Sequence, residues 1–150
     1  MTDRVEIRRL GPGDREAVLE ASALFDRPAE PSLADRFLDA GGHVLFIASV
    51  DDAPVGFVSG VEMTHPDKGT EMFLYELGVA EPFRRQGIAT ALVAALRELA
   101  RERGCYGMWV AVDAENTGAH AFYMSFGPPE PGEQVVHYTW HLGEPDSADP

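Results

Sequence analysis

Apolar and polar residues change their spacing several times along the chain, and each spacing predicts a kind of element. An alternation with period two over residues 4–10 predicts a half-buried strand. Apolar residues at helical spacing follow over 14–25 and again over 32–41, where Asp14 and Ser32 stand at the N-cap positions. The chain therefore begins with a predicted strand that is followed by two helices.

Period-two spacing returns at His43 and favours a sheet from there on. Two strands over 43–50 and 55–63, joined by a tight turn, form a predicted hairpin. The pattern further predicts strands over 71–79, 106–112 and 133–142, and helices over 86–103 and 117–126. A helix between two strands implies a right-handed crossover, so we expect an α/β fold, of mixed α+β character, with a mixed sheet.

The length and the composition fit one compact domain. The chain has 150 residues, of which 45% are hydrophobic, and no apolar run approaches the length of about 20 residues that a membrane span needs. The last residues are polar and include proline. We therefore expect a single domain over 1–143 and a disordered tail over 144–150.

Cysteine content and charge restrict the location and the partners of the protein. Cys105 is the single cysteine, and the charged N-terminus lacks the apolar region of a signal peptide, so we expect a cytoplasmic protein without an internal disulfide. The formal net charge of −13 disfavours nucleic acid and anionic membranes, because both attract positive charge. A cationic partner fits this charge, although an acidic surface that only keeps the protein soluble explains it as well.

The stretch VAEPFRRQGIATAL, residues 79–92, indicates an anion site at the start of a helix. The first N–H groups of a helix lack partners and its N-terminus is partly positive, so a loop there can wrap an anion. Gly87 would let the backbone approach closely, and the guanidinium groups of Arg84 and Arg85 match phosphate oxygens. The glycine pattern is neither a dinucleotide fingerprint nor a Walker A loop. A pyrophosphate site fits these features, and two arginines that only solvate the helix start are the alternative.

The same stretch resembles the acetyl-CoA loop of the GNAT N-acetyltransferases, with Arg84, Gly87 and Ala89 at its three defining positions. The later segment NTGAHAFY, residues 116–123, is similar to another helix of that superfamily, and the resemblance is close over 71–127. It implies a GNAT-like fold, in which helices, about four in number, cover both faces of a central, twisted, mostly antiparallel sheet of about six to seven strands.

Within the superfamily, the segment YELGVAEPFRRQGIATAL is most similar in sequence to the small aminoglycoside 3-N-acetyltransferases. One departure is the segment Gly127-Pro128-Pro129, which stands where many members have Gly-Phe. The resemblance therefore leaves open the turn that follows the last predicted helix.

The resemblance implies acetyl-CoA as the cofactor. In the family, the backbone of the strand before the loop pairs with the pantetheine arm like an added strand, and the loop binds the pyrophosphate. The residues assigned to the cofactor in this way are Leu77, Gly78, Val79, Arg84, Arg85, Gln86, Gly87, Ile88, Ala89, Thr90 and Asn116.

Amine acetylation needs a base for the ammonium and an acid for the departing thiolate, and two residues are candidates. Glu76 is predicted to share its strand face with Met72 and Leu74, which would partly desolvate its carboxylate and raise its pKa. A solvent-facing glutamate is the alternative, and the resemblance, in which an acidic residue here often acts as the base, favours catalysis. Tyr123 matches the position that protonates the CoA sulfur, and core packing beside Phe122 is the alternative.

Acidic residues are the candidates for binding the acceptor. Asp113 and Glu115 end a predicted strand beside the expected acetyl site and join Glu76 as substrate-binding candidates. Further acidic residues occupy the first helical region, which often walls the acceptor cleft in this family: Asp26, Glu30, Asp35 and Asp39. These residues would bind several ammonium groups at once, or they form a solvated acidic face.

The sequence thus predicts an acetyl-CoA-dependent N-acetyltransferase of a small polycationic amine, and the resemblance implies the 3-amino group of aminoglycoside antibiotics, hence antibiotic resistance. Acetylation of a protein N-terminus or lysine is an alternative, and a non-catalytic acyl-CoA-binding module is another. Relatives are commonly dimers, so a homodimer is a candidate assembly. No metal is expected, because His137 and His141 are four residues apart on a predicted strand and therefore about 13 Å from each other.

Overall fold

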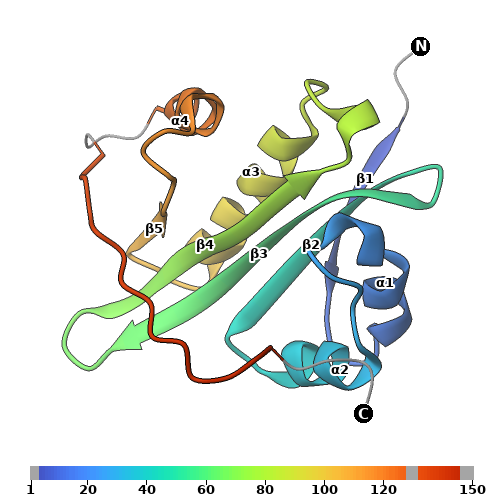
Figure 1. Ribbon diagram of the computed structural model, residues 1–150, viewed down its shortest axis with the longest axis horizontal. Helices are drawn as coiled ribbons and strands as arrows, with labels where there is room; N and C mark the ends of the chain where they lie inside the picture. Colours follow the sequence, from blue (N-terminus) through green and yellow to red (C-terminus); the bar gives the residue numbers. More distant parts are fainter. Residues whose placement is uncertain (1–3, 128–131, 146–150) are drawn as a thin grey trace. The chain divides into compact units, whose positions relative to one another are not determined.

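The computed structural model describes residues 4–127 and 132–145, and the chain forms two compact units, 1–110 and 111–150 (Figure 1). The elements of the first unit are β1 (Val5–Leu10), α1 (Arg15–Glu20), the 3-10 helix η1 (Ser22–Leu24), α2 (Pro31–Asp39), β2 (His43–Val50), β3 (Ala53–His65), β4 (Gly69–Val79), the 3-10 helix η2 (Glu81–Phe83), α3 (Ile88–Glu102) and β5 (Gly107–Val110). The second unit contains α4 (Thr117–Met124). One domain over 1–143 stays a prediction.

A five-stranded sheet forms the centre of the first unit, in the order β1-β2-β3-β4-β5. Neighbours from β1 to β4 pair antiparallel, whereas β5 runs parallel to β4, so the predicted mixed and mostly antiparallel sheet is confirmed. Asp51 and Asp52 join β2 to β3 with φ angles of 50° and 66°, as a two-residue hairpin turn requires. The helix α3 forms the predicted connection from β4 to β5.

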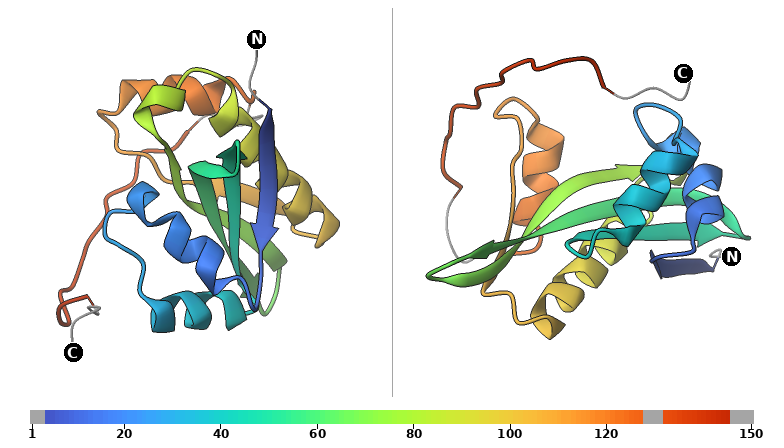
Figure 2. Two further views of the ribbon diagram at one scale, coloured as in Figure 1. Left: turned by 90° about the vertical axis from the view of Figure 1, so that its right-hand side faces the viewer. Right: turned by 90° about the horizontal axis from the view of Figure 1, so that it is seen from below.

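Helices cover both faces of this sheet, α3 on one side and α1 with α2 on the other (Figures 1 and 2). The largest side chains with less than 2% of their surface exposed belong to the sheet and to α3, and they are Met72, Leu74, Leu92, Leu96 and Val58. Gly60 of β3 lies among them, where a Cβ would come within 2.8 Å of Leu96 Cδ1 and 2.9 Å of Met72 Sδ. Close packing of α3 on the sheet therefore depends on glycine at this position.

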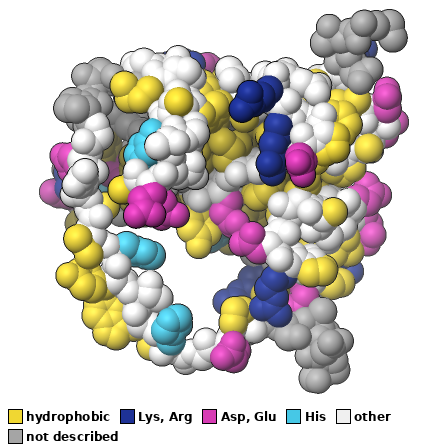
Figure 3. Space-filling view, turned by 45° about the horizontal axis from the view of Figure 1, so that its top comes forward, with side chains coloured by type: hydrophobic (Ala, Val, Ile, Leu, Met, Phe, Trp, Pro, Cys, Tyr) yellow, Lys and Arg dark blue, Asp and Glu magenta, His cyan; other side chains and the backbone are white. Residues whose placement is uncertain are grey.

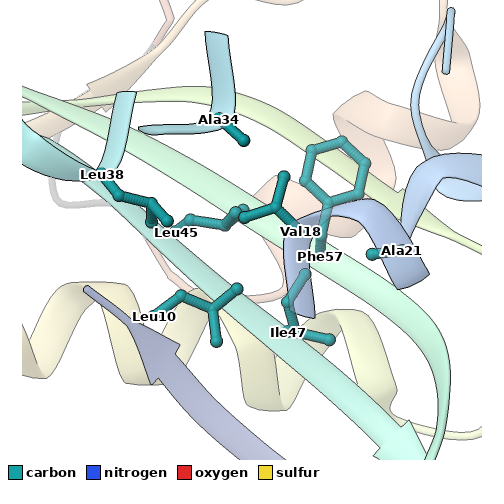
Figure 4. Close-up of a cluster of buried hydrophobic side chains, with 8 residues drawn as sticks. All are labelled: Leu10, Val18, Ala21, Ala34, Leu38, Leu45, Ile47 and Phe57. Carbon is teal, nitrogen blue, oxygen red and sulfur yellow. The ribbon is translucent and has the colours of Figure 1, made fainter. Parts of the chain in front are cut away.

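A second cluster of buried side chains lies between the sheet and the pair α1 and α2 (Figure 4). Leu45 and Phe57 of the sheet pack there with Val18 of α1 and Leu38 of α2. The ring of Phe25, just after η1, meets the Phe57 ring edge to face with 4.9 Å between the centroids. Phe57 thus identifies the face of the sheet that carries α1 and α2.

The first two helices begin and end differently from the predictions. The helix expected over 14–25 is the short α1 followed by the 3-10 turn η1. Asp14 does not cap α1 with its side chain, because its Oδ2 accepts a hydrogen bond from the Gly11 N–H at 2.8 Å instead. Pro31 begins α2 ahead of Ser32, since proline suits the first turn of a helix, where the backbone N–H has no partner.

The predicted strand over 133–142 does not form: these residues are described and contain no strand, so the described sheet has five strands rather than about six to seven. The apolar side chains of Val136, Tyr138 and Trp140 are 73% to 78% exposed. Alternation is a local property of the sequence, but a strand also needs backbone partners from elsewhere in the chain, and the alternation does not specify them. Pro128, Pro129 and the tail from 146 onward lie outside the described residues.

Candidate active site

A β-bulge in β4 sets the position of Glu76. Leu74 pairs with Gly60 of β3 and Glu76 pairs with Ser59, so Tyr75 is an extra residue on the β4 side. The N–H of Glu76 donates a hydrogen bond to Ser59 Oγ at 3.1 Å, and Ser59 is buried. The bulge therefore has a fixed side-chain anchor, and it interrupts the regular alternation of β4 just before Glu76.

Glu76 projects from the face of the sheet that carries α1 and α2. Directly paired residues share a face, and its partner Ser59 lies two residues from Phe57, which packs beneath α1. Met72 and Leu74 are buried on the opposite face, beneath α3. The prediction that Glu76 shares a face with these two residues is wrong, because the bulge changes the alternation between positions 74 and 76.

The environment of Glu76 still raises the pKa of its carboxyl group. Burial is the larger cause, and the negative charge of Asp26, in the segment after η1, is the second. Glu76 nevertheless belongs to the exposed residues of the sheet, so its carboxylate can exchange protons with water. Both causes act in the direction that a general base needs, since they strengthen proton binding at pH values closer to neutrality.

Beside Glu76, β4 has an edge without a neighbouring strand. β5 pairs with residues 71–74 of β4 only, and within the described chain no strand pairs with 75–79 on that side. The Ala80 N–H bonds to the Val55 carbonyl of β3 at 2.8 Å, so the alternation directs the backbone groups of Leu77 and Val79 toward the open edge. This edge can accept an extended ligand arm as an added strand, and the assignment of 77–79 to the cofactor stays a prediction.

Packing against neighbouring residues of the protein explains why position 78 is glycine. A Cβ at this position would lie 2.9 Å from Phe57 Cε1 and 3.8 Å from the Leu24 carbonyl oxygen. A larger residue would therefore displace the Phe57 ring from the core beneath η1.

The loop after β4 enters α3 through two residues with positive φ, Arg85 at 62° and Gly87 at 84°. A Cβ on Gly87 would meet no protein atom within 4 Å, so glycine is needed for the backbone conformation, and the space before it is open to a ligand. The first backbone bond of α3 runs from the Ala91 N–H to the Gly87 carbonyl at 3.0 Å, which leaves the N–H groups of 88–90 without acceptors within the helix. With no acidic residue in its first turn, this helix start suits an anion.

Two side chains brace this loop from within. Arg84 Nε donates a hydrogen bond to the Val79 carbonyl oxygen at 2.9 Å, and Gln86 Nε2 donates to the Pro82 carbonyl oxygen at 3.1 Å. Both side chains remain exposed, as does Arg85. The three residues are therefore near the helix start, and their contacts with phosphate stay a prediction.

In the second unit, Asn116 is the N-cap of α4, because its Oδ1 accepts a hydrogen bond from the Ala119 N–H at 3.0 Å. The ring Nε2 of His120 lies 3.0 Å from the Asp113 carbonyl oxygen and ties the preceding loop to α4. Asp113, Glu115 and Asn116 are exposed and line an open pocket. The loop therefore presents two carboxylates to solvent, and their binding to an acceptor stays a prediction.

Tyr123 of α4 lies next to Phe122, whose ring meets it edge to face with 5.0 Å between the centroids. Burial raises the pKa of Tyr123, so its phenol keeps the proton at neutral pH. A protonated phenol can supply the proton that a departing thiolate needs, and this role for Tyr123 stays a prediction.

The acidic residues of the first helical region differ in their surroundings. Asp26 acts on Glu76 and raises its pKa, whereas Asp35 pairs with Arg15, which lowers the pKa of Asp35. Acidic side chains are spread over the face drawn in Figure 3, next to exposed hydrophobic ones. Sequence reasoning missed the specific effect of Asp26, because no local pattern connects two residues so far apart in the chain.

Three further features concern a metal site, a membrane-spanning helix and the reactivity of the cysteine. Across residues 4–127 and 132–145, no three His, Cys, Asp or Glu side chains come together as a metal site. The helices of those ranges are too short or too polar to cross a membrane. Cys105 is half-buried, and burial raises the pKa of its thiol, which disfavours the reactive thiolate.

Comparisons with known sequences agree with this geometry. The profile of the Acetyltransferase (GNAT) family matches residues 14–127. Aminoglycoside N(6')-acetyltransferase type 1 of Salmonella typhimurium is 30% identical over 118 residues, which are 74% of this chain and 80% of that protein. N-acetyltransferase 8F1 of Rattus norvegicus is 28% identical over 107 residues, and this match covers 71% of the chain but 48% of the rat protein. The chain thus spans about half the length of that relative.

Solved structures share the fold. An aminoglycoside acetyltransferase from an uncultured soil metagenomic sample, in complex with trehalose, superposes with a TM-score of 0.83 at 25% identity, covering 93% of this chain and 97% of that one. Aminoglycoside N-acetyltransferase AAC(6')-Iy in complex with CoA gives a TM-score of 0.77 at 23% identity, with coverages of 95% and 98%. The predicted GNAT-like fold is confirmed. The chain belongs to the acetyltransferase (GNAT) family, a family of acyltransferases whose acyl donor is acetyl-CoA.

Proposed function

We propose that this protein is an N-acetyltransferase that transfers the acetyl group of acetyl-CoA to an amino group of a polycationic small molecule, an aminoglycoside. The observation that carries the proposal is the carboxyl group of Glu76, whose pKa is raised and which stands beside the open edge of β4. This edge leads directly into the loop and the helix start of α3. A base, an edge for an extended arm and an anion site therefore follow one another along a single stretch of chain.

The donor set at α3 fits the pyrophosphate of the cofactor. The N–H groups of 88–90 lack acceptors within the helix, and the positive end of the helix dipole lies at the same place. The backbone of Leu77 and the N–H of Val79 would hold the pantetheine arm along the edge of β4, since the Val79 carbonyl oxygen already accepts a hydrogen bond from Arg84 Nε. We expect Arg85 and Gln86 to add contacts to the phosphates, and Asn116 to contact the same arm from the start of α4.

In the reaction that we propose, Glu76 accepts a proton from the ammonium group of the acceptor, directly or through water. Acetyl-CoA supplies the acetyl group as a thioester. The amine nitrogen forms the new C–N bond, the C–S bond breaks, and the electron pair leaves with the sulfur. The O–H of Tyr123 protonates this sulfur, and the resulting phenolate regains a proton as the nitrogen releases its second one, directly or through water. The phenol is protonated at neutral pH, and burial raises its pKa further.

Charge supports a polycationic acceptor. Glu76 and Asp26 place two carboxyl groups near each other, Asp113 and Glu115 are exposed, and the formal net charge is −13. Each screened contact with an ammonium group contributes little, so a tight acceptor must carry several such groups. Relatives at 25% and 30% identity are named aminoglycoside acetyltransferases, which supports the same class of acceptor.

The proposal also specifies which amino group of the aminoglycoside is acetylated. The wording of residues 75–92 resembles enzymes that modify the 3-amino group, whereas the Salmonella relative is named for the 6'-amino group. We propose the 3-amino group, and nuclear magnetic resonance of the purified product assigns the position directly. A product acetylated at the 6'-amino group would overturn this choice and leave the acceptor class unchanged.

The test of the function measures CoA release with a thiol reagent. The panel contains an aminoglycoside, a monoamine, a peptide with a free N-terminus and a lysine peptide, each with wild-type protein and with Glu76→Gln. We expect the highest kcat/KM with the aminoglycoside and a large loss in Glu76→Gln. A peptide as the best substrate would indicate a protein acetyltransferase. Cofactor binding without CoA release for any amine would indicate a non-catalytic module.

The cytoplasmic location and the homodimer are separate parts of the proposal. Light scattering coupled to size-exclusion chromatography, with and without CoA, measures the assembly. A monomer under both conditions would overturn the homodimer without affecting the proposed chemistry.

A further inference from the structure

Three aromatic side chains form an exposed surface on β4 and β5, and we call Phe73, Tyr75 and Trp109 the aromatic shelf. The rings of Phe73 and Trp109 stack with 4.2 Å between their centroids and an interplanar angle of 19°. The rings of Phe73 and Tyr75 are tilted at 50° with 5.6 Å between their centroids. Tyr75 is 60% exposed and Trp109 is 45% exposed, so the packing within the first unit leaves the shelf accessible.

The shelf lies on the same face of the sheet as Glu76. Phe73 pairs in register with Trp109 of the parallel strand β5, and it alternates with Met72 and Leu74, which are buried under α3. The bulge then inserts Tyr75 directly before Glu76, which faces the same side as Phe57. A ligand whose amine reaches Glu76 would therefore find these rings on the same face of β4.

Glu71 lies on β4 two residues before Phe73, at the outer end of this surface. Its carboxylate accepts a hydrogen bond from the Tyr106 O–H and contacts His65 Nε2 at 2.9 Å. These two contacts, and in smaller part the indole of Trp109, keep the pKa of Glu71 below its usual range. Glu71 is thus an anion with protein partners, and one of them is a member of the shelf.

We propose that the aromatic shelf is a subsite that stacks on a ring of the acceptor and makes the enzyme prefer cyclic polyammonium acceptors over acyclic polyamines. This rests on the proposed function. Aromatic faces attract cations and also cover the apolar C–H face of a sugar or cyclitol ring. An acyclic polyamine offers the charge alone, whereas an aminoglycoside offers both. The neighbouring carboxyl groups of Glu76 and Asp26 favour such a cationic ligand over an apolar protein surface.

Steady-state kinetics with two acceptors tests the proposal. Tyr75→Ala and Trp109→Ala are compared with wild type on gentamicin and on spermine, which both carry several ammonium groups. We expect each variant to raise KM for gentamicin by about 2- to 30-fold, the range of a cation–π or stacking contact, with a change below about 2-fold for spermine. The matched controls are Tyr75→Phe and Trp109→Phe, which keep a ring and should retain most of the preference.

A binding measurement separates this proposal from the proposed function. The chain has two tryptophans, so Trp140→Phe leaves Trp109 as the single tryptophan, which can be excited selectively over the tyrosines. Titration with gentamicin, without acetyl-CoA, should change the Trp109 fluorescence, and Tyr75→Ala should weaken the apparent affinity. Binding of this kind without acetyl transfer would contradict the proposed function and support the shelf.

Three results would overturn the shelf. Acetylation of gentamicin with unchanged KM in both alanine variants would leave the proposed function intact and remove the shelf from recognition. Equal losses on gentamicin and spermine, with altered circular dichroism, would assign the rings to folding. A change from dimer to monomer in Tyr75→Ala without a change in acceptor preference would make the shelf a contact between two copies of the chain.

Discussion

At the scale of single residues, Glu76 combines a raised pKa with a position that sequence alternation does not predict. Its N–H donates a hydrogen bond to Ser59 across the bulge, and burial and the negative charge of Asp26 both raise the pKa of its carboxyl group. A base of this kind is active when deprotonated, so kcat/KM should fall as the pH decreases through the raised pKa.

Asp26→Asn tests the electrostatic part of this environment. Removal of the negative charge lowers the pKa of Glu76, so the acidic limb of the kcat/KM profile should move to lower pH. The matched control is Asp35→Asn, which makes the same chemical change in a residue that pairs with Arg15. A limb that stays in place in Asp26→Asn, or that moves equally in both variants, would contradict the coupling.

Glu76→Gln should separate stability from activity. A raised folded-state pKa means that the folded protein binds this proton more tightly than the unfolded chain does. The stabilisation from the protonated carboxyl is complete below the unfolded pKa and is lost as the pH rises through the folded pKa. At neutral pH the substitution should therefore leave Tm equal or higher while kcat falls. Thermal melts at two pH values check the sign, and a lower Tm at neutral pH would contradict it.

Tyr123→Phe tests the proposed acid. The substitution keeps the ring beside Phe122 and removes only the hydroxyl group. We expect kcat to fall by about 10²- to 10⁴-fold, the usual contribution of general acid catalysis, with little change in CoA affinity. Calorimetry with CoA provides the control. Full activity in this variant would assign Tyr123 to packing alone.

At the scale of elements, the junction between the β4 loop and α3 carries the cofactor prediction. Gly87 has a φ of 84° and open space in front of its Cα, so a substitution there changes both backbone strain and local charge. Gly87→Glu should abolish CoA binding, because its carboxylate would face the phosphates at the helix start. Gly87→Gln is the matched control, since it introduces the same strain and nearly the same volume without the charge.

Calorimetry with CoA measures both variants, and circular dichroism confirms that each is folded. We expect Gly87→Gln to bind more weakly than wild type but more tightly than Gly87→Glu. Equal affinities in the two variants would mean that backbone strain or bulk, rather than charge, controls binding, and near-normal affinity in Gly87→Glu would place the pyrophosphate elsewhere.

At the scale of the whole molecule, the charge of −13 predicts a dependence on salt. KM for an aminoglycoside should increase as salt rises from about 10 mM to 150 mM, because the Debye length falls from about 30 Å to about 8 Å. A monoamine should show much less dependence. Asp113→Asn should raise KM for the aminoglycoside more than for the monoamine. Aminoglycoside kinetics that do not respond to salt would contradict recognition by charge.

Most helices and strands, and the family, could be predicted from the sequence. Helical spacing over 86–103 predicted α3, and alternation predicted β2, β3 and β4 within a few residues, because each pattern reports local packing against a single face. The sequence around Arg84, Gly87 and Ala89 resembled the GNAT loop, and the match to the family profile confirmed the family. These features are encoded over short distances along the chain.

The effects of distant segments on each other could be read only from the folded chain. The bulge opposite Ser59 turned Glu76 away from Met72 and Leu74, and the end of the β5 pairing at residue 74 opened the edge of β4. The apolar alternation over 133–142 produced no strand in the described residues, since a strand needs a partner as well as a pattern. Pairing register and the electrostatic field from Asp26 depend on contacts between segments that are far apart in sequence, and local spacing does not encode such contacts.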